Sequence, residues 1–363
     1  MLSENIKKLE ESGIRKVFKM AMSLDKKKSI NLSIGQPHFE VSKELKELAT
    51  EAINDDYNSY FPTEGYLPLR KKICKKLKEK NNIDADEDDV IVTAGVSGAI
   101  HLLFSSIINE GDEVILPDPY FVLYEQIMKL LGAKIVYLDT YPDFRINPQK
   151  LESLISNKTK LLIINSPNNP TGIVYSESEL KEVAQVASKH GLLVMSDEIY
   201  EDFDFDKKFF SIGSIYDNTV TLNGFSKNLA ITGWRLGYAH GPKEIIEAMN
   251  KLQMYTYVCA PSFAQLAVSQ LDEIKTGFDY RKNRDLVLER LKDKYEFNIP
   301  EGAFYAYIKI PEGKKDFLDQ LYKENVLVIP GGVFSQKTGY FRLSFAVNEM
   351  ELRRGLEVFK KLV

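Results

Sequence analysis

From residue 90 onward, short apolar segments rich in β-branched residues alternate with longer segments of helical periodicity. The predicted strands cover residues 90–93, 113–116, 134–138, 160–165, 192–196, 219–222 and 236–239. The predicted helices between them cover residues 98–109, 120–131, 178–190 and 243–257. Because parallel strands need crossover connections, which helices supply, this alternation favours a mostly parallel sheet with helices on both faces. We therefore predict an α/β fold built on a seven-stranded sheet.

The segments at the two ends of the chain predict a second, smaller unit. Residues 6–24 have roughly helical spacing and predict a helical arm, followed by a solvated turn at residues 26–28. The C-terminal stretch mixes elements, namely a predicted helix at 279–294 and predicted strands near 303–310, 326–329 and 341–345. We predict a large domain over residues 45–265 and a small α+β domain formed by residues 1–44 and 266–363, which closes over a substrate.

A loop at residues 58–70 separates two further predicted helices, 42–54 and 69–80. It contains Tyr60, Phe61 and Tyr66 among turn-forming residues. Aromatic side chains of this kind serve either a core or an interface. Composition alone favours core packing for this loop.

The residues that follow the predicted strands are the candidates for ligand binding, because open parallel sheets bind ligands at the carboxyl ends of their strands. After the first strand comes TAGVSGAI, whose small residues enter a helix that could receive a phosphate at its N-terminus. This segment is neither GxGxxG nor GxxxxGKS, which argues against a dinucleotide or P-loop site. Later strands lead into NSPNNPTG and SDEIY. Asp197 lies in SDEIY, where it either faces a ligand or caps a helix.

The segment TLNGFSKNLAITGWRLGYAHG sets one lysine, Lys227, among small and apolar residues, with Arg235 eight positions later. A lysine withdrawn from water has a lowered pKa, which suits a lysine that forms a Schiff base. From this segment alone, a surface lysine at a turn remains the alternative.

Composition disfavours several other classes. The chain has 363 residues and a net charge of −4, so it has no bulk attraction for nucleic acid or for an anionic membrane surface. Only two cysteines, Cys74 and Cys259, and four scattered histidines occur, so neither a disulfide framework nor a metal site is predicted. The polar N-terminus and the lack of a long apolar run predict a cytoplasmic protein.

Together, these segments resemble the class I/II aminotransferases, which are pyridoxal-phosphate enzymes of fold type I. The resemblance extends over essentially the whole chain and is closest to the prokaryotic aspartate and aromatic aminotransferases. Its motifs occur in the family's order: Gly-Gln-Pro at 35–37, TAGVSGAI, GDEVILPDPYF, NSPNNPTG, SDEIY, GFSKNLAITGWRLGY, PEGAFY, VIPGGVF and YFRLSFA.

The resemblance implies a role for each of five residues at the cofactor ring. Lys227 would form the Schiff base with pyridoxal 5′-phosphate and then move a proton as general acid and base. Asp197 would face the pyridine nitrogen and keep it protonated. Asn169 and Tyr200 would bond the 3′ oxygen of the ring. Phe121 would stack on the ring face.

The resemblance also implies how the phosphate and the substrate are bound. Val96 and Ser97 with Arg235 would hold the phosphate, since a guanidinium binds phosphate in a bidentate manner. Tyr60 would reach the phosphate of a neighbouring subunit, which predicts a homodimer with a shared active site. Arg342 would pair with the substrate carboxylate. That carboxylate would also meet Asn169 and the backbone at Gly35.

Two departures from the family pattern bear on the phosphate and on specificity. Many relatives have a serine where this chain has Gly224, so one phosphate contact is missing or comes from another group such as Ser226. Some aspartate-type relatives carry a lysine in the phosphate loop, whereas Ser97 stands there in this chain. We therefore predict aromatic or broad neutral amino donors, including aspartate-like ones, with a 2-oxo acid such as 2-oxoglutarate as acceptor.

Other functions remain to be compared with transamination. A carbon–sulfur β-lyase or a related synthase could use the same cofactor residues, and the motifs do not separate them. A ligand-sensing domain of a transcription regulator would need an N-terminal winged helix, for which about 30 residues are too few. A nicotinamide dehydrogenase is disfavoured by the missing GxGxxG.

Overall fold

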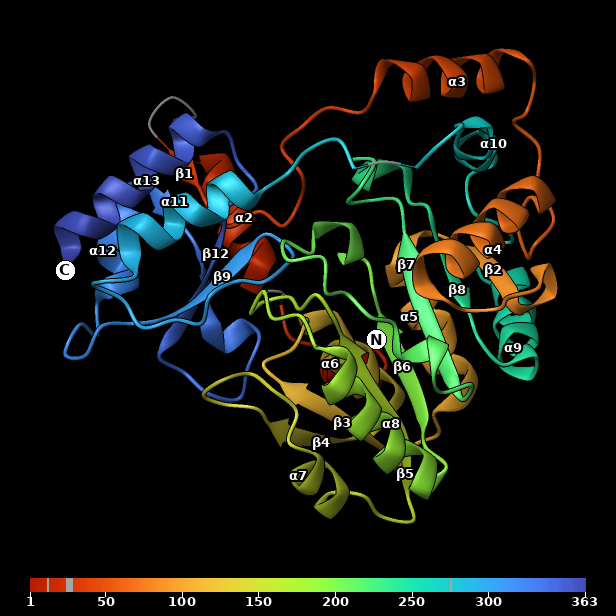
Figure 1. The fold of residues 1–363 in the computed structure, drawn as a ribbon, viewed down its shortest axis with the longest axis horizontal. Coiled ribbons are helices and arrows are strands. Elements are labelled where there is room, and N and C mark those ends of the chain that lie inside the picture. The colour runs from red at the N-terminus through yellow and green to blue at the C-terminus, as the bar shows by residue number, and fades with distance from the viewer. Residues whose placement is uncertain (12, 24–28, 275) are drawn as a thin grey trace.

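The computed structural model describes residues 1–11, 13–23, 29–274 and 276–363, and its largest element is a seven-stranded sheet (Figure 1). The strands are β2 (Val90–Thr93), β3 (Glu113–Asp118), β4 (Lys134–Asp139), β5 (Thr159–Asn165), β6 (Leu193–Asp197), β7 (Thr219–Gly224) and β8 (Gly237–His240). Their order is β2-β8-β7-β6-β5-β3-β4, and only β8 runs antiparallel to its neighbours. The predicted mostly parallel sheet is confirmed.

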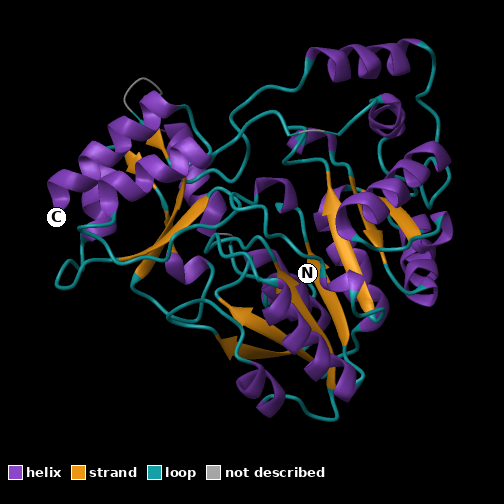
Figure 2. Ribbon diagram, in the orientation of Figure 1, coloured by secondary structure: helices purple, strands orange, loops and turns teal. Residues whose placement is uncertain are grey.

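Helices cover both faces of this sheet, as Figure 2 shows. One face packs against α5 (Gly95–Ile107), α6 (Val122–Leu131) and α9 (Lys243–Met254), and the other packs against α7 (Pro148–Ser153) and α8 (Glu177–His190). Within β5, Leu161 and Ile163 belong to the first core, while Leu162 and Ile164 belong to the second. The strands are apolar on both sides because side chains alternate between two covered faces.

The C-terminal segment forms a separate α+β layer beside the large sheet (Figure 1). Three antiparallel strands, in the order β11-β12-β9, comprise β9 (Tyr305–Lys309), β11 (Ile329–Pro330) and β12 (Tyr340–Ser344). A short parallel pair joins β1 (Ile30–Asn31) to β10 (Val326–Leu327). The helices α11 (Arg281–Leu291), α12 (Phe317–Lys323) and α13 (Glu349–Leu362) pack on these strands. The first and last parts of the chain therefore share one core.

The remaining helices include both confirmed and corrected predictions. The predicted helix 42–54 is α3 (Lys43–Asn54), with the Ser42 hydroxyl accepting from the backbone of Leu45. The predicted helical arm is wrong as a single helix, because it is divided into α1 (Glu4–Lys7) and α2 (Gly13–Ser23). Residues 24 and 26–28 lie outside the described residues. The chain also forms α4 (Leu67–Asn81) and α10 (Ser262–Gln270).

The predicted strand at 326–329 is wrong as one strand. Val326 and Leu327 pair with β1, whereas Ile329 and Pro330 pair with β12. The sequence pattern hides this division because all four residues are apolar. No described helix has the length and apolar composition that crossing a membrane requires. The division into domains at residues 45 and 265 stays a prediction.

Candidate active site

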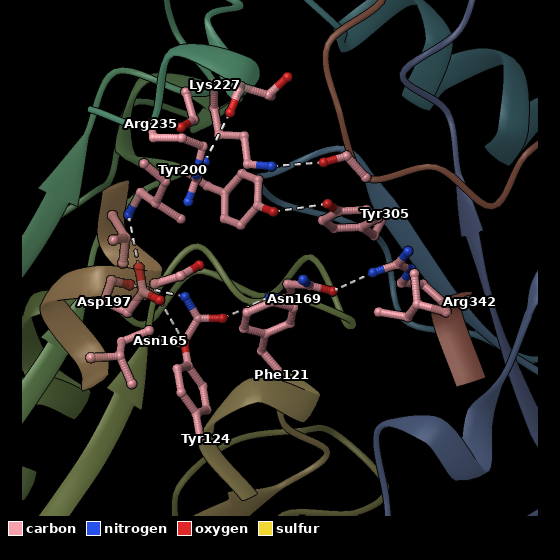
Figure 3. Close-up of a pocket in the computed structure, with 18 residues that line it drawn as sticks. Phe121, Tyr124, Asn165, Asn169, Asp197, Tyr200, Lys227, Arg235, Tyr305 and Arg342 are labelled. Carbon is pink, nitrogen blue, oxygen red and sulfur yellow. Dashed lines mark hydrogen bonds between the residues drawn. The ribbon is translucent and has the colours of Figure 1, made fainter. Parts of the chain in front are cut away.

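A pocket lies where the carboxyl ends of the large sheet's central strands meet the small α+β layer (Figure 3). It is lined by Ile14, Gly35, Val96, Ser97, Ile100, Phe121, Tyr124, Asn165, Asn169, Asp197, Ile199, Tyr200, Ser226, Lys227, Thr232, Arg235, Tyr305 and Arg342. The strands β5 and β6 end at Asn165 and Asp197, and Lys227 follows the end of β7. Segments far apart in the sequence therefore converge because the parallel strands end at one edge.

Lys227 is half-buried, and its ammonium donates a hydrogen bond of 2.7 Å to the carbonyl of Gly35. Burial and the positive charges of Arg342 and Arg235 lower its pKa to about 8, and the charge of Asp197 opposes this shift only in part. A lysine with this pKa is partly neutral near pH 7 and can act as a nucleophile. The predicted withdrawal of Lys227 from water is confirmed.

Asp197 is the carboxylate at the end of β6, and it is only 3% exposed. Burial raises its pKa to about 6, whereas the Tyr124 hydroxyl, the Ile199 N–H and the Lys227 charge lower it. The Tyr124 hydroxyl donates to Asp197 Oδ2 at 2.7 Å. Asn165 Nδ2 donates to the Asp197 carbonyl at 2.9 Å. Asp197 is thus held firmly in a site where its negative charge needs a cationic ligand.

The first turn of α5 and Arg235 together form a candidate anion site. No side chain caps this helix, so Val96 and Ser97 leave backbone N–H groups available beside its positive dipole end. Arg235 Nη2 lies 3.5 Å from the carbonyl of Ala94, the N-cap residue. A Cβ on Gly95 would come within 2.5 Å of Arg235 Nη2, so glycine lets the guanidinium approach the helix. Thr232 and Ser226 add hydroxyl groups to the lining of the same pocket.

Arg342 is a fully buried cation on β12, 2% exposed. Its Nη1 donates to Asn169 Oδ1 at 2.9 Å, and its Nη2 donates to the Ser33 carbonyl at 2.8 Å. Its Nε has no hydrogen-bond partner, and no carboxylate among the described residues pairs with it. A buried guanidinium without a counter-ion is costly, so this geometry favours an anionic ligand such as a carboxylate.

Aromatic and amide groups complete the pocket between these charges. Tyr200 and Tyr305 share a hydrogen bond of 2.8 Å between their hydroxyl groups. Asn165 Oδ1 accepts from the backbone N–H of Asn169 at 2.9 Å, which orients the NSPNNPTG turn. The ring of Phe121 faces the pocket in Figure 3 and packs edge-on against Tyr124. The arrangement presents a flat apolar wall beside groups that recognise charge.

All predicted site residues except Tyr60 line this one pocket. Tyr60 is 80% exposed, so the expectation of core packing is wrong for it. Its neighbours Phe61 and Tyr66 are half-buried and stack on one another with ring centroids 4.8 Å apart. The roles assigned to these residues stay predictions at this point.

The structure explains the departure at Gly224 and adds residues that sequence reasoning missed. A Cβ on Gly224 would lie 2.9 Å from Gly237 Cα, so a serine would force β7 and β8 apart. The missed residues are Ile14, Ile100, Tyr124, Asn165, Ile199, Thr232 and Tyr305. All of these except Ile14 and Tyr124 lie within quoted motifs and could have been found there, whereas no sequence signal marks Ile14. No group of three or more potential metal ligands occurs among the described residues.

Comparisons with known proteins agree with this geometry. The family described as aminotransferase class I and II matches residues 27–359. A probable aspartate aminotransferase of Methanocaldococcus jannaschii is 36% identical over the full length of both chains. An aromatic-amino-acid aminotransferase of Thermococcus litoralis is 35% identical, covering 100% of this chain and 98% of that protein. The solved structure of Thermus thermophilus aspartate aminotransferase with maleate matches with a TM-score of 0.96 at 33% identity, covering 100% of both chains.

The lowered pKa of Lys227 generates a testable prediction. In protein freed of small ligands, acetic anhydride should label Lys227 with a rate that rises through about pH 8, because only the neutral amine reacts. Competitive labelling from pH 6 to pH 11, followed by mass spectrometry of the peptide, measures this midpoint. Lys227→Arg identifies the peptide signal. Labelling that rises only near 10.5, the ordinary lysine value, would contradict the electrostatics described above.

Proposed function

The chain belongs to the class I and II aminotransferase family and transfers amino groups, and we propose that it does so with pyridoxal 5′-phosphate bound as a Schiff base on Lys227. One observation carries this proposal. The pocket combines a lysine of lowered pKa, a buried carboxylate and a guanidinium at a helix N-terminus. A carbon–sulfur β-lyase is not favoured, because the relatives are named aminotransferases.

The described residues fit this cofactor. Asp197 would hold the protonated pyridine nitrogen, because a buried carboxylate favours a neighbouring cation. Asn169 and Tyr200 would bond the 3′ oxygen, and Phe121 would stack on the ring. The phosphate would be held by Arg235 with Val96, Ser97 and Ser226, all of which line the pocket. When bound, the cofactor supplies an electron sink for negative charge that develops at the substrate Cα.

Lys227 performs two tasks in this account. Its amine would hold the cofactor, and in its neutral form it would accept the proton that the substrate Cα releases and then donate it again as a general acid. Burial and the neighbouring arginines favour the neutral form, so the amine can accept a proton near pH 7. The Gly35 carbonyl accepts a hydrogen bond from Lys227 and holds it on the side of the small α+β layer.

Arg342 binds the substrate α-carboxylate in this proposal, and its rigid setting supports the role. Its guanidinium lies between the rings of Tyr305 and Phe334, 4.4 Å and 4.6 Å from their centroids. Asn169 and the Ser33 carbonyl fix its two terminal nitrogens. A guanidinium held in this way orients a carboxylate before the reaction, which lowers the entropic cost of catalysis.

The rest of the pocket supports neutral amino donors. The cations among its described lining residues are Lys227, Arg235 and Arg342. In this proposal, Lys227 and Arg235 bind the cofactor, and Arg342 binds the substrate α-carboxylate. The apolar side chains of Ile14, Ile100 and Ile199 line the same space. We therefore propose aromatic or other neutral amino acids as donors and a 2-oxo acid such as 2-oxoglutarate as acceptor. A cytoplasmic location stays a prediction.

A homodimer with a shared site is the second part of the proposal. Tyr60 is 80% exposed, and Tyr57, Leu67, Met254 and Tyr255 also expose large apolar surfaces. Exposed apolar side chains of this size favour an interface with another protein surface. Tyr60 would cross to the phosphate of the partner's cofactor, which makes each site incomplete without the second chain.

A panel of substrates tests the proposed specificity. We expect kcat/KM for phenylalanine and tyrosine with 2-oxoglutarate to exceed that for aspartate by about tenfold or more, because the described lining residues include no further cation to bind a distal carboxylate. Pyruvate and oxaloacetate serve as alternative acceptors, and Arg342→Ala should lose activity with every donor. A tenfold preference for aspartate would contradict the proposed donor class. Ammonia release without any acceptor would contradict transamination.

Mixed dimers test whether Tyr60 serves the partner. Lys227→Ala chains and Tyr60→Ala chains are mixed, denatured and refolded together. If Tyr60 acts across the interface, each hybrid dimer regains one intact site, so activity should rise to about one quarter of the wild-type value. Activity equal to the mean of the two variants assayed separately would place Tyr60 in its own chain's site or outside any site.

A further inference from the structure

Beneath the turn that carries Asp197 and Tyr200 lies a group of buried and partly buried polar residues that the proposed function leaves unused. It consists of Lys76 and Asn81 on α4 and of Glu198 and Glu201 on the turn itself, and we call it the α4 cluster. Glu198 is 1% exposed, and Glu201 is 9% exposed. None of the four residues lines the active-site pocket. Four polar side chains in such a place call for an explanation, because burying them costs free energy.

The contacts within the α4 cluster are dense. Asn81 Nδ2 donates to both carboxylates, at 3.2 Å to Glu198 and at 2.8 Å to Glu201. The hydroxyl groups of Ser196 and Ser211 donate to Glu198 Oε1 at 2.9 Å and 2.6 Å. Lys76 forms a close ion pair with Glu201. Two carboxylates therefore share one amide donor and one ammonium.

Burial and the shortage of positive charge together determine which side chains of the α4 cluster are protonated. Burial raises the pKa of Glu198 to about 8, and the charge of Glu201 adds to that shift. Burial lowers the pKa of Lys76, but the charge and hydrogen bond of Glu201, together with Tyr238 and Glu198, outweigh burial and keep the ammonium protonated. Tyr238 on β8 also faces Lys76, and burial raises its pKa as well. Near pH 7, Glu198 is therefore mostly neutral, and the ammonium of Lys76 faces the carboxylate of Glu201.

The α4 cluster is joined to both segments that supply catalytic groups. The Glu198 N–H donates to the Leu222 carbonyl at 2.9 Å, which fixes the turn to β7. The next acid, Asp202, accepts from Lys80 at 3.2 Å and from Asn228 Nδ2 at 2.8 Å. Asn228 directly follows Lys227. The last turns of α4 therefore hold the Asp197 turn and the Lys227 loop against one another.

We propose that Glu198 and Glu201, clamped by Lys76 and Asn81, are positioning residues that fix Asp197 and Tyr200 against the bound cofactor. The inference rests on the proposed function, because Asp197 and Tyr200 act there on pyridoxal phosphate. Stability alone is a poor explanation for the α4 cluster, since apolar residues of similar volume often replace a buried ion pair without loss. Rigid placement of a charged group next to a cofactor is a better one.

Three variants of the holoenzyme test this role. Glu198→Gln mimics the neutral side chain: its Oε1 can accept from Asn81, and its Nε2 can donate to the Ser196 and Ser211 hydroxyls. We therefore expect kcat to stay within about twofold of the wild type. Glu198→Ala removes the clamp, and kcat should fall by about tenfold to a hundredfold while the donor KM changes little, because small misplacements of catalytic groups are costly. Glu113→Ala is the matched control, since Glu113 is also buried and hydrogen-bonded but lies at the far end of β3.

A spectroscopic readout separates positioning from general destabilisation. The pH titration of the cofactor's visible absorbance should shift in Glu198→Ala by about one pH unit, because Asp197 no longer holds the ring as before, and should not shift in Glu198→Gln or Glu113→Ala. If Glu198→Ala fails to fold, Asn81→Ala should give the same kcat loss and shift. The inference would be overturned if a folded Glu198→Ala or Asn81→Ala variant kept both its kcat and its absorbance titration unchanged. It would also be overturned if Glu198→Gln lost as much activity as Glu198→Ala. Failure of wild type to take up the cofactor would instead overturn the proposed function.

Discussion

The active site is organised by an imbalance of charge inside a partly closed pocket. Three cations, Lys227, Arg235 and Arg342, line it with a single carboxylate, Asp197, among its described residues. Among these, Arg342 is buried without a carboxylate partner, and a buried unpaired charge is costly, so the described residues alone leave this site incomplete. A ligand with a phosphate and a substrate with a carboxylate would supply the missing negative charges. Burial and the same excess of positive charge lower the pKa of Lys227, so the features that favour anionic ligands also favour its reactive neutral form.

The seven-stranded sheet determines where these charged side chains lie. The parallel strands bring Asn165, Asp197 and the Lys227 loop to one edge, and the small α+β layer brings Arg342 and Tyr305 to the opposite wall. Glycines at 95, 224 and 237 allow β7, β8 and the first turn of α5 to approach more closely than side chains permit. The anion site at α5 therefore depends on backbone packing as much as on Arg235.

Sequence periodicity predicted the large sheet well, because each strand is a continuous apolar run between turn residues. It failed at residues 326–330, where adjacent residues pair with two different strands, because the tertiary structure decides which strands pair. Family motifs located the charged residues of the pocket. They did not locate Tyr124, whose hydroxyl meets Asp197 from α6, or Ile14, which comes from the N-terminal arm. Such partners are set by how helices pack, and local sequence carries no signal for that. Composition likewise does not reveal that Tyr60 is exposed.

The central claim is that Lys227 bonds covalently to pyridoxal phosphate. Borohydride reduction of the protein after incubation with the cofactor, followed by digestion and mass spectrometry, tests it most directly. The account predicts a phosphopyridoxyl group on the peptide that contains Lys227, with loss of the visible absorbance on reduction, and no such group in Lys227→Ala. A reduced protein in which Lys227 is unmodified, or in which another lysine carries the group, would contradict it.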